Sequence, residues 1–346
     1  MDKSRRAFLG TGTAGLAALL TPAARAAPTL SRAEATPAVI KPPRLRPGDT
    51  IGLINPVSFG VEPAILQSVR QSLEALGMTV RCGAWIGTTA NDRERAAEVN
   101  AMFADPAVRA ILPVRGGWGS ARLLPHLDYD LIRRNPKVVL GASDVGALLL
   151  GIHARTGLVT FHGPMGISSW VPFTVEQMKR VIFECEAARI GKLEDAGDGD
   201  AADQTPRTIT PGLARGRLLG GNLTVVSSMV GSPYLGGGDD LILFLEEVRE
   251  ATSEVARMLT QLEQAGILAH VRGLVFGQCT RCPSPQVGEE LTLERVLAEQ
   301  VGSLGIPAWR GAQIGHVERQ LTVPIGVRAE IDASLGVIQL LEPAVC

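Results

Sequence analysis

The chain has 346 residues, with 34 Lys and Arg against 35 Asp and Glu, which gives a formal net charge of -1. At roughly 150 residues per domain, this length predicts about two domains and allows a substantial buried core. Hydrophobic residues make up 45% and charged residues 20% of the chain, so the composition excludes a generally disordered protein. The balanced charge gives no electrostatic reason to expect a nucleic-acid partner.

Residues 1–26 have the pattern of a bacterial export signal. Ser4-Arg5-Arg6-Ala7-Phe8-Leu9 is similar to the twin-arginine signature, an uncharged apolar run follows, and Ala24-Arg25-Ala26 is a small-x-small cleavage pattern. The apolar run is too short to span a bilayer comfortably, and no later segment is apolar for about 20 residues. We expect a twin-arginine signal peptide and an exported, for instance periplasmic, protein with no stable membrane span after cleavage. A basic N-terminal tail is the alternative.

Short apolar strands alternate with amphipathic helices over residues 48–170, after a Pro- and Ala-rich linker at 27–47. Strands are expected at 51–54, 78–80, 108–114 and 137–140, and helices at 63–76, 93–104 and 145–154. Alternation of this kind predicts a parallel sheet with crossover helices. We therefore expect a Rossmann-like or amidotransferase-like α/β domain.

The alternation ends near residue 170. A helix-like stretch at 175–188 and a polar, acidic stretch at 191–211 predict an interdomain connection over 171–211. Beyond it, strands are expected at 241–245, 271–276, 321–331 and 336–341, and an amphipathic helix at 253–265. This mixture predicts a β-rich α+β domain over 212–346.

Ser143 lies where the expected strand at 137–140 runs directly into the helix at 145–154. A serine at such a turn presents its hydroxyl outward, next to a helix N-terminus, which is the geometry of a nucleophile elbow. The spacing is G-x-S-x-x-G, one residue longer than the familiar G-x-S-x-G. Ser143 as a simple N-cap, with Asp144 favouring the helix dipole, is the alternative.

A glycine-rich loop, Arg115-Gly116-Gly117-Trp118-Gly119-Ser120, follows the expected strand at 108–114. Clustered glycines expose backbone N–H groups and allow a ligand to come close. The residues that complete a phosphate-binding loop are absent. A cradle for an oxyanion or carboxylate and a plain tight turn are both consistent with the loop.

A serine nucleophile needs a base, and the base needs an orienting carboxylate. Glu246, at the end of an apolar strand, and His316, in a Gly- and Pro-punctuated stretch, are candidates. A solvated strand end and a loop histidine are the simpler roles, because spacing alone does not show proximity. The competing histidines are His126, His153, His162 and His270. Of these, His162 precedes Gly163-Pro164 and is placed to line the same cleft as Ser143.

Two of the five cysteines form the motif Cys279-Thr-Arg-Cys282. A zinc site would need a second pair or nearby histidines. A local disulfide and two unpaired thiols are the alternatives. No metal-ligand spacing such as H-E-x-x-H occurs, so neither a metal nor another cofactor is expected.

Eight segments together resemble the LD-carboxypeptidase family of serine peptidases, in the family's order and over nearly all of the chain after residue 45. They are Gly48–Pro56, Arg115–Leu124, Leu127–Leu131, Gly141–Asp144, Thr156–Pro164, Gly220–Leu223, Leu243–Glu247 and Gly315–His316. The resemblance implies an N-terminal α/β domain, a C-terminal β-rich domain and usually a homodimer. It also implies release of the terminal D-alanine from murein tetrapeptides, with a small peptide as substrate.

By this resemblance, Ser143 is the nucleophile, Glu246 the orienting acid and His316 the general base. The resemblance thus implies a site between the domains, with an oxyanion held by backbone N–H groups. The donors would be those of Asp144 and of Gly116 or Gly117. The candidates for binding the substrate's free carboxylate are Arg115, Arg122 and Arg249.

Trp118 stands where the family commonly has Tyr, so an indole donor replaces a phenol in a candidate substrate contact. Two other functions stay open. One is a related amidase of the microcin-immunity kind, which acts on peptidyl-nucleotide antibiotics with the same triad. The other is a murein-peptide-binding protein without turnover.

Overall fold

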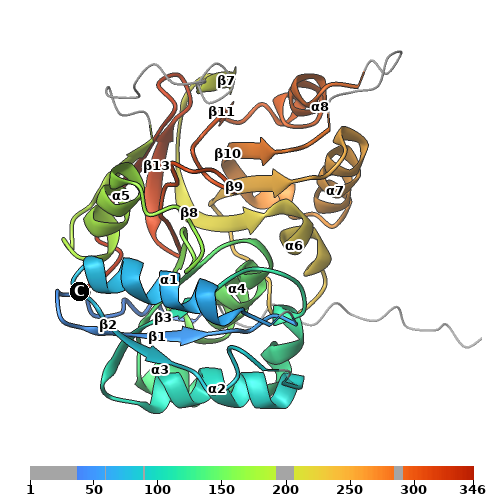
Figure 1. Cartoon of the computed structure of the whole chain (residues 1–346). Helices are drawn as coiled ribbons and strands as arrows, with labels where there is room; N and C mark the ends of the chain where they lie inside the picture. The colour runs from blue at the N-terminus through green and yellow to red at the C-terminus, as the bar shows by residue number, and fades with distance from the viewer. Residues whose placement is uncertain (1–36, 59, 89, 192–205, 284–290) are drawn as a thin grey trace, which may run out of the picture. The chain divides into compact units, whose positions relative to one another are not determined.

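Two β-sheets form the framework of the computed structural model, which describes residues 37–58, 60–88, 90–191, 206–283 and 291–346 (Figure 1). The strands of the first sheet are β1 (Thr50–Ile54), β2 (Thr79–Cys82), β3 (Val108–Pro113), β4 (Val138–Gly141), β5 (Thr160–His162) and β12 (Val323–Ile325). Their order is β12-β5-β4-β3-β1-β2, and every pairing is parallel except that of β12 with β5. The α/β prediction for the first half is confirmed.

Crossover helices cover both faces of this sheet. They are α1 (Pro63–Ala75), α2 (Asp92–Ala104), α3 (Tyr129–Arg134) and α4 (Gly146–Thr156), with the short helices η1 (Ser120–His126) and η2 (Ser143–Val145). Helix α1 lies on one face, with α2 and α3 on the other (Figure 1). Helix α2 begins in a capping box, in which Asn91 and Glu94 each bond the other's backbone N–H. Crossover connections through these helices place the carboxyl ends of the parallel strands at one edge of the sheet, where ligands bind in this class of fold.

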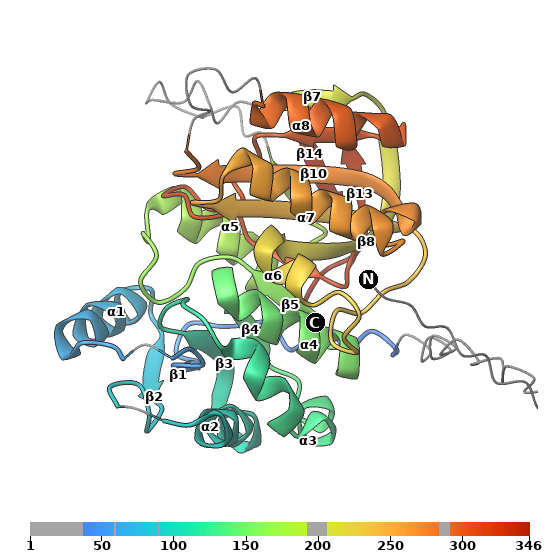
Figure 2. The ribbon, with the colours of Figure 1, turned by 90° about the vertical axis from the view of Figure 1, so that its right-hand side faces the viewer.

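The second sheet confirms the β-rich α+β prediction. Its strands are β6 (Arg189–Gly191), β7 (Arg207–Thr210), β8 (Leu213–Asn222), β9 (Leu241–Val248), β10 (Val271–Thr280), β11 (Ala308–Arg310), β13 (Arg328–Asp332) and β14 (Val337–Leu340). Their order is β6-β14-β13-β8-β9-β10-β11-β7, with β8 to β11 parallel. The other helices are α5 (Pro172–Ile182), α6 (Leu223–Ser228), α7 (Thr252–Gln264), α8 (Leu293–Gln300), η4 (Leu268–His270) and η5 (Gly302–Leu304). Figure 2 shows α6, α7 and α8 along one side of this sheet.

The single strand expected at 321–331 is wrong. The chain turns at Gly326, where φ is +96°, and the two halves enter different sheets. Strand β12 pairs with β5 of the first sheet, whereas β13 pairs with β8 and β14 of the second. Gly326 is the sequence signal for this break, because β12 before it is buried throughout and β13 after it alternates between buried and more exposed residues.

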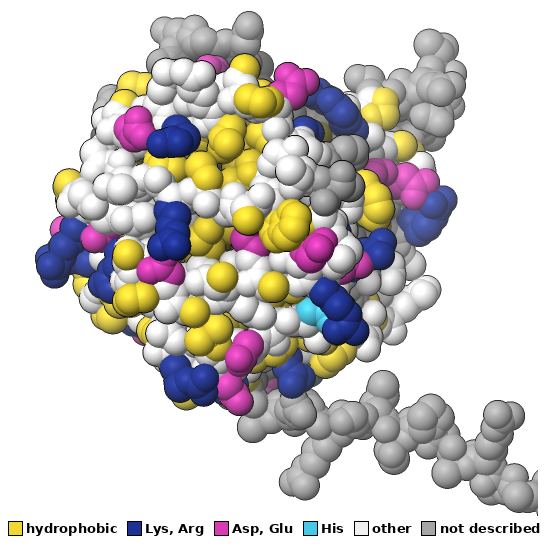
Figure 3. All heavy atoms as spheres, turned by 60° about the horizontal axis from the view of Figure 1, so that its bottom comes forward, with side chains coloured by type: hydrophobic (Ala, Val, Ile, Leu, Met, Phe, Trp, Pro, Cys, Tyr) yellow, Lys and Arg dark blue, Asp and Glu magenta, His cyan; other side chains and the backbone are white. Residues whose placement is uncertain are grey.

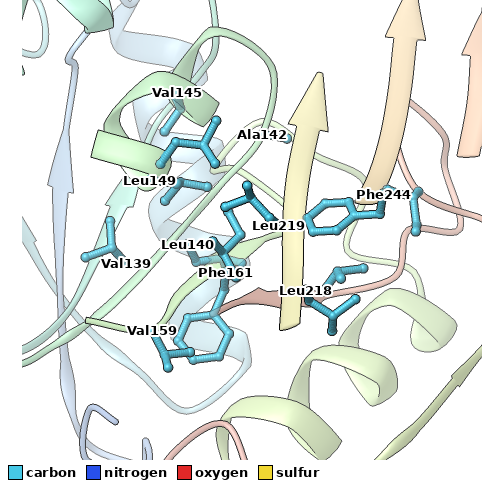
Figure 4. Packing of buried hydrophobic residues seen from close by; sticks show 14 of the residues in the cluster. Val139, Leu140, Ala142, Val145, Leu149, Val159, Phe161, Leu218, Leu219 and Phe244 are labelled. Carbon is cyan, nitrogen blue, oxygen red and sulfur yellow. The ribbon is translucent and has the colours of Figure 1, made fainter. Parts of the chain in front are cut away.

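One hydrophobic core joins the sheets. Leu140 of β4 and Phe161 of β5 belong to the same buried cluster as Leu219 of β8 and Phe244 of β9 (Figure 4). All four side chains are at most 6% exposed. Burial of such side chains contributes roughly 1.5–3 kcal/mol each. The packing holds the carboxyl ends of β4, β5, β8 and β9 in one fixed arrangement.

Three features concern the partners and the location of the protein: its surface charge, the character of its helices and its N-terminal segment. Figure 3 shows basic and acidic side chains interspersed over the face at the bottom of Figure 1. In the part of the chain that the structure describes, no helix has the length and apolar character needed to cross a membrane. The expected signal peptide at 1–26 lies outside the described residues.

Candidate active site

Ser143 occupies a strained turn between β4 and α4. Strand β4 ends at Gly141, Ala142 is extended, and Ser143, the first residue of η2, has φ +59°, with α4 following η2 directly. A positive φ is uncommon for a residue other than glycine and concentrates at functional sites. The side chain is half-buried. The local geometry is therefore that of a nucleophile elbow.

The glycine-rich loop after β3 lies directly against this serine. A Cβ atom at Gly116 would be 2.8 Å from Ser143 Cβ and 3.0 Å from Oγ, so only glycine allows this approach without a shift. The carboxylate of Asp144 anchors the far end of the loop, because it accepts hydrogen bonds from Ser120 N at 2.8 Å and from Gly119 N at 3.3 Å. Of the three predicted oxyanion residues, Gly116 contacts Ser143, Asp144 follows it directly, and Gly117 is exposed.

Glu246 and His316 form a hydrogen-bonded pair. The carboxylate Oε2 lies 3.0 Å from His316 Nδ1. Glu246 is fully buried near the end of β9, and the His316 side chain is 25% exposed. Gly315 makes the pairing possible, since it has φ +123° and a Cβ there would lie 2.7 Å from Glu246 Oε2. Because Nδ1 faces the carboxylate, Nε2 is the ring nitrogen left for proton transfer.

The charges around His316 favour its protonated form. Burial lowers the pKa of His316, but the hydrogen bond and charge of Glu246 and the charge of Glu247 outweigh burial and raise the pKa above its ordinary value. The Arg249 guanidinium acts in the opposite direction. A histidine with this balance is a stronger base than a free imidazole, as proton abstraction from a serine requires.

Glu247, the next carboxylate along β9, has a different role. It accepts hydrogen bonds from Asn222 Nδ2, from the backbone N–H and hydroxyl of Thr224, and from Val248 N. Burial raises its pKa, against these bonds. Glu247 therefore fastens the start of α6 to β9.

Ser143 follows β4 of the first sheet, whereas Glu246 lies on β9 of the second sheet and His316 on the loop between β11 and β12. The two sheets meet at His162. In the described structure no hydrogen bond joins Ser143 to His316. His162 pairs in register with Gly141 of β4, and its ring packs edge-on against Phe244 of β9 at a centroid distance of 5.7 Å. His162 is fully buried. The sequence placed His162 near Ser143, but nothing in it indicated contact with β9.

The predicted substrate residues lie at different places around Ser143. Trp118 is 51% exposed, with the Arg122 guanidinium 6.0 Å from its ring centroid. Arg122 itself is paired with Asp92, and Arg115 Nε donates to the Gly116 carbonyl. Of the three arginines, Arg249 is the one whose charge acts on His316.

The structure also resolves the cysteines. Cys279 and Cys282 form a disulfide, and Cys279 pairs in register with Glu247. Cys82, Cys185 and Cys346 are free. Among the described residues, no three His, Cys, Asp or Glu side chains are grouped as a metal site would require.

Comparison with known proteins gives the family. The model of the LD-carboxypeptidase N-terminal domain matches residues 51–163, and that of the C-terminal domain matches residues 215–331. A probable murein peptide carboxypeptidase of Bacillus subtilis is 34% identical over 85% of this chain and 92% of its own length.

Two solved structures share the fold. The muramoyltetrapeptide carboxypeptidase of Oxalobacter formigenes has a TM-score of 0.72 at 27% identity, covering 84% of this chain and 97% of its own. The microcin C7 self-immunity protein MccF of Escherichia coli has a TM-score of 0.78 at 27% identity, covering 89% of this chain and 100% of its own. These matches span both sheets of the described structure and the segments that carry Ser143, Glu246 and His316. The chain belongs to the LD-carboxypeptidase family of serine peptidases.

Proposed function

We propose that this protein releases the terminal D-alanine from murein tetrapeptides by serine catalysis. One observation carries the proposal: the buried Glu246 carboxylate holds His316 at Nδ1, in a fold that presents Ser143 on a strained turn beside a glycine-rich loop. This arrangement supplies an orienting acid, a base and a nucleophile.

The chemistry follows from these groups. His316 Nε2 takes the Ser143 proton as Oγ attacks the scissile carbonyl carbon, and Glu246 stabilises the imidazolium. Backbone N–H groups of Asp144 and of the loop at Gly116 and Gly117 hold the oxyanion, and each such donor typically lowers the barrier by roughly 3–4 kcal/mol. His316 then protonates the leaving amine, D-alanine departs, and water hydrolyses the acyl-enzyme.

Recognition of a peptide with a free C-terminal carboxylate requires a cationic side chain that binds this carboxylate. Arg249 is the strongest candidate, because it is exposed and its charge acts on His316. Trp118 forms an exposed aromatic surface on the loop that contacts Ser143. We propose that Trp118 contacts the peptide and that Arg249 binds its terminal carboxylate, with Arg115 holding the loop through Gly116.

A second candidate activity is amide hydrolysis of a peptidyl-nucleotide antibiotic. It is supported by the likeness to MccF and by the exposed Trp118 ring, on which a base stacks readily. Parallel assays with a murein tetrapeptide and an aminoacyl-sulfamoyl nucleotide distinguish the two activities.

The decisive experiment incubates the full-length purified protein with a murein tetrapeptide and measures released D-alanine. We expect release by the natural protein and none by Ser143→Ala. Equal rates for both proteins would refute serine catalysis. Tight tetrapeptide binding without turnover would instead identify a binding protein.

Two properties of the whole protein belong to the same proposal. The twin-arginine pattern at 5–6 supports export, which Arg5→Lys with Arg6→Lys would block in cell fractionation. The family resemblance supports a homodimer, which light scattering on purified protein tests. A monomer at micromolar concentration would overturn that part alone.

A further inference from the structure

His162 is a buried histidine to which the proposed reaction gives no role. It is fully buried at the end of β5, and neither ring nitrogen has a hydrogen-bond partner among the described residues. Buried polar atoms without partners typically destabilise a fold, so they call for an explanation.

The neighbour that matches this unsatisfied donor is Glu246. Its Oε2 is bonded to His316, but Oε1 is buried and accepts no hydrogen bond in the described structure. A neutral imidazole carries one N–H donor, and a carboxylate oxygen accepts one. The two unsatisfied groups are chemically complementary.

The register of β9 directs Glu246 towards His162. Side chains two residues apart on a strand share a face, so Glu246 lies on the same face as Phe244. The Phe244 ring meets the His162 ring edge-on, and Nδ1 of His162 is 3.4 Å from where a Gly221 Cβ would stand. Gly221 pairs with Leu245, and the next residue, Asn222, pairs with Glu246. His162 therefore packs against Phe244 on the face of β9 that carries the acid, and it contacts β8 one residue from the position that pairs with Glu246.

The electrostatic environment keeps His162 neutral. Burial lowers its pKa to about 4, with Glu246 acting to raise it and His316 to lower it. At neutral pH the ring is therefore an uncharged hydrogen-bond donor, and Glu246 is the carboxylate whose charge acts on it.

We propose that His162 is a positioning residue of this active site, which donates a hydrogen bond to Oε1 of Glu246, directly after a small side-chain rotation or across one water molecule. The bond fixes the carboxylate that orients His316. Because β5 also pairs with β4 just before Ser143, the same residue ties the position of the acid to that of the nucleophile. The inference rests on the proposed serine reaction.

The first test uses kinetics. His162→Phe keeps a planar aromatic ring but removes the donor, and we expect about a tenfold fall in kcat/KM, mainly through kcat. The acid limb of the kcat/KM profile should move to higher pH. The His162 donor stabilises the negative charge of Glu246 more when His316 is neutral than when His316 is protonated. Loss of the donor therefore favours protonated His316 and raises the His316 pKa.

The groups that set this limb are Glu246 and Glu247 on β9, Arg249 after it, and His162 itself. His162→Asn or His162→Gln, which retain an N–H donor, should restore part of the rate and return the limb. An unchanged profile in folded His162→Phe would overturn the proposal.

His153 gives a matched control. It is also buried, and its Nδ1 bonds only the Leu158 carbonyl within α4 and the turn that follows. His153→Phe should lower thermal stability but leave the acid limb in place. A shift of the limb equal to that of His162→Phe would mean that loss of any buried histidine has this effect, which would overturn the proposal.

A second readout does not depend on turnover. In protein labelled with ¹⁵N-histidine, the His162 N–H signal, assigned with His162→Gln, should be shifted downfield by its bond to the carboxylate. It should move upfield in Glu246→Ala. An unchanged chemical shift of the His162 N–H signal in Glu246→Ala would refute the proposal even if the protein hydrolyses tetrapeptides. If the His162 signal responds to Glu246→Ala as expected but the protein does not hydrolyse tetrapeptides, the proposed function alone is refuted.

Discussion

His316 Nδ1 lies 3.0 Å from Oε2 of Glu246, and that carboxylate has no exposure to solvent. A buried ion partner of this kind fixes the tautomer of an imidazole and increases its basicity at once. Substitutions in this pair should therefore change both kcat and the pH dependence of kcat/KM.

Glu246→Gln should reduce kcat by about 10³- to 10⁴-fold, because the neutral amide neither fixes the tautomer nor stabilises the imidazolium. Glu246 raises the pKa of His316, so removal of its charge must lower that pKa. The acid limb of residual kcat/KM should move to lower pH, measured from pH 4.5 to 9. Glu263→Gln, at an exposed position of α7, is the control. A limb that stays in place would contradict the assigned pair.

Gly116→Ala tests the contact between the glycine-rich loop and Ser143. The new methyl group would stand 2.8 Å from Ser143 Cβ, so the loop or the serine must move. We expect a fall in kcat of about a hundredfold, since a misplaced oxyanion donor costs about that much. Gly146→Ala is the matched control in α4, where the nearest atom would be 3.7 Å away. Similar losses in both variants would show that the Gly116 contact is not specific.

Arg249→Gln tests recognition of the terminal carboxylate. Loss of a charge-assisted hydrogen bond should raise KM for the free peptide acid about tenfold or more, with little effect on a peptide amide. The Arg249 charge lowers the pKa of His316, so the acid limb should move to higher pH. Arg257→Gln on the exposed side of α7 should change neither quantity. Equal KM changes for acid and amide would refute the assignment.

The disulfide between Cys279 and Cys282 makes a prediction about covalent state. Unfolded, unreduced protein should titrate three thiols, and reduced protein five. Replacement of both cysteines by serine should lower the free energy of unfolding by about 2 kcal/mol in the chain-entropy account of so short a loop. Urea unfolding of the two proteins measures the difference. Five thiols without reductant would exclude the bond.

Local sequence patterns predicted most of the first sheet, because its buried strands alternate along the chain with amphipathic helices. The elbow at Ser143 was also predictable from a strand that meets a helix without a linker. The Glu246–His316 contact depends on β9 and a distant loop, and only the family resemblance indicated it. The buried contact of His162 with Phe244 was not predictable, since packing between two sheets leaves no periodic signal. The choice between disulfide and free thiols was also settled by the fold.

The crossing of the chain at Gly326 has a consequence for how such enzymes can be divided. A fragment that ends at residue 211 lacks β12 and exposes the backbone edge of β5, the strand that carries His162. A fragment that begins at residue 212 keeps a strand whose partner it has lost. Neither half is an exchangeable module, so recombination between relatives should yield active chimeras only when β12 and β5 come from the same parent.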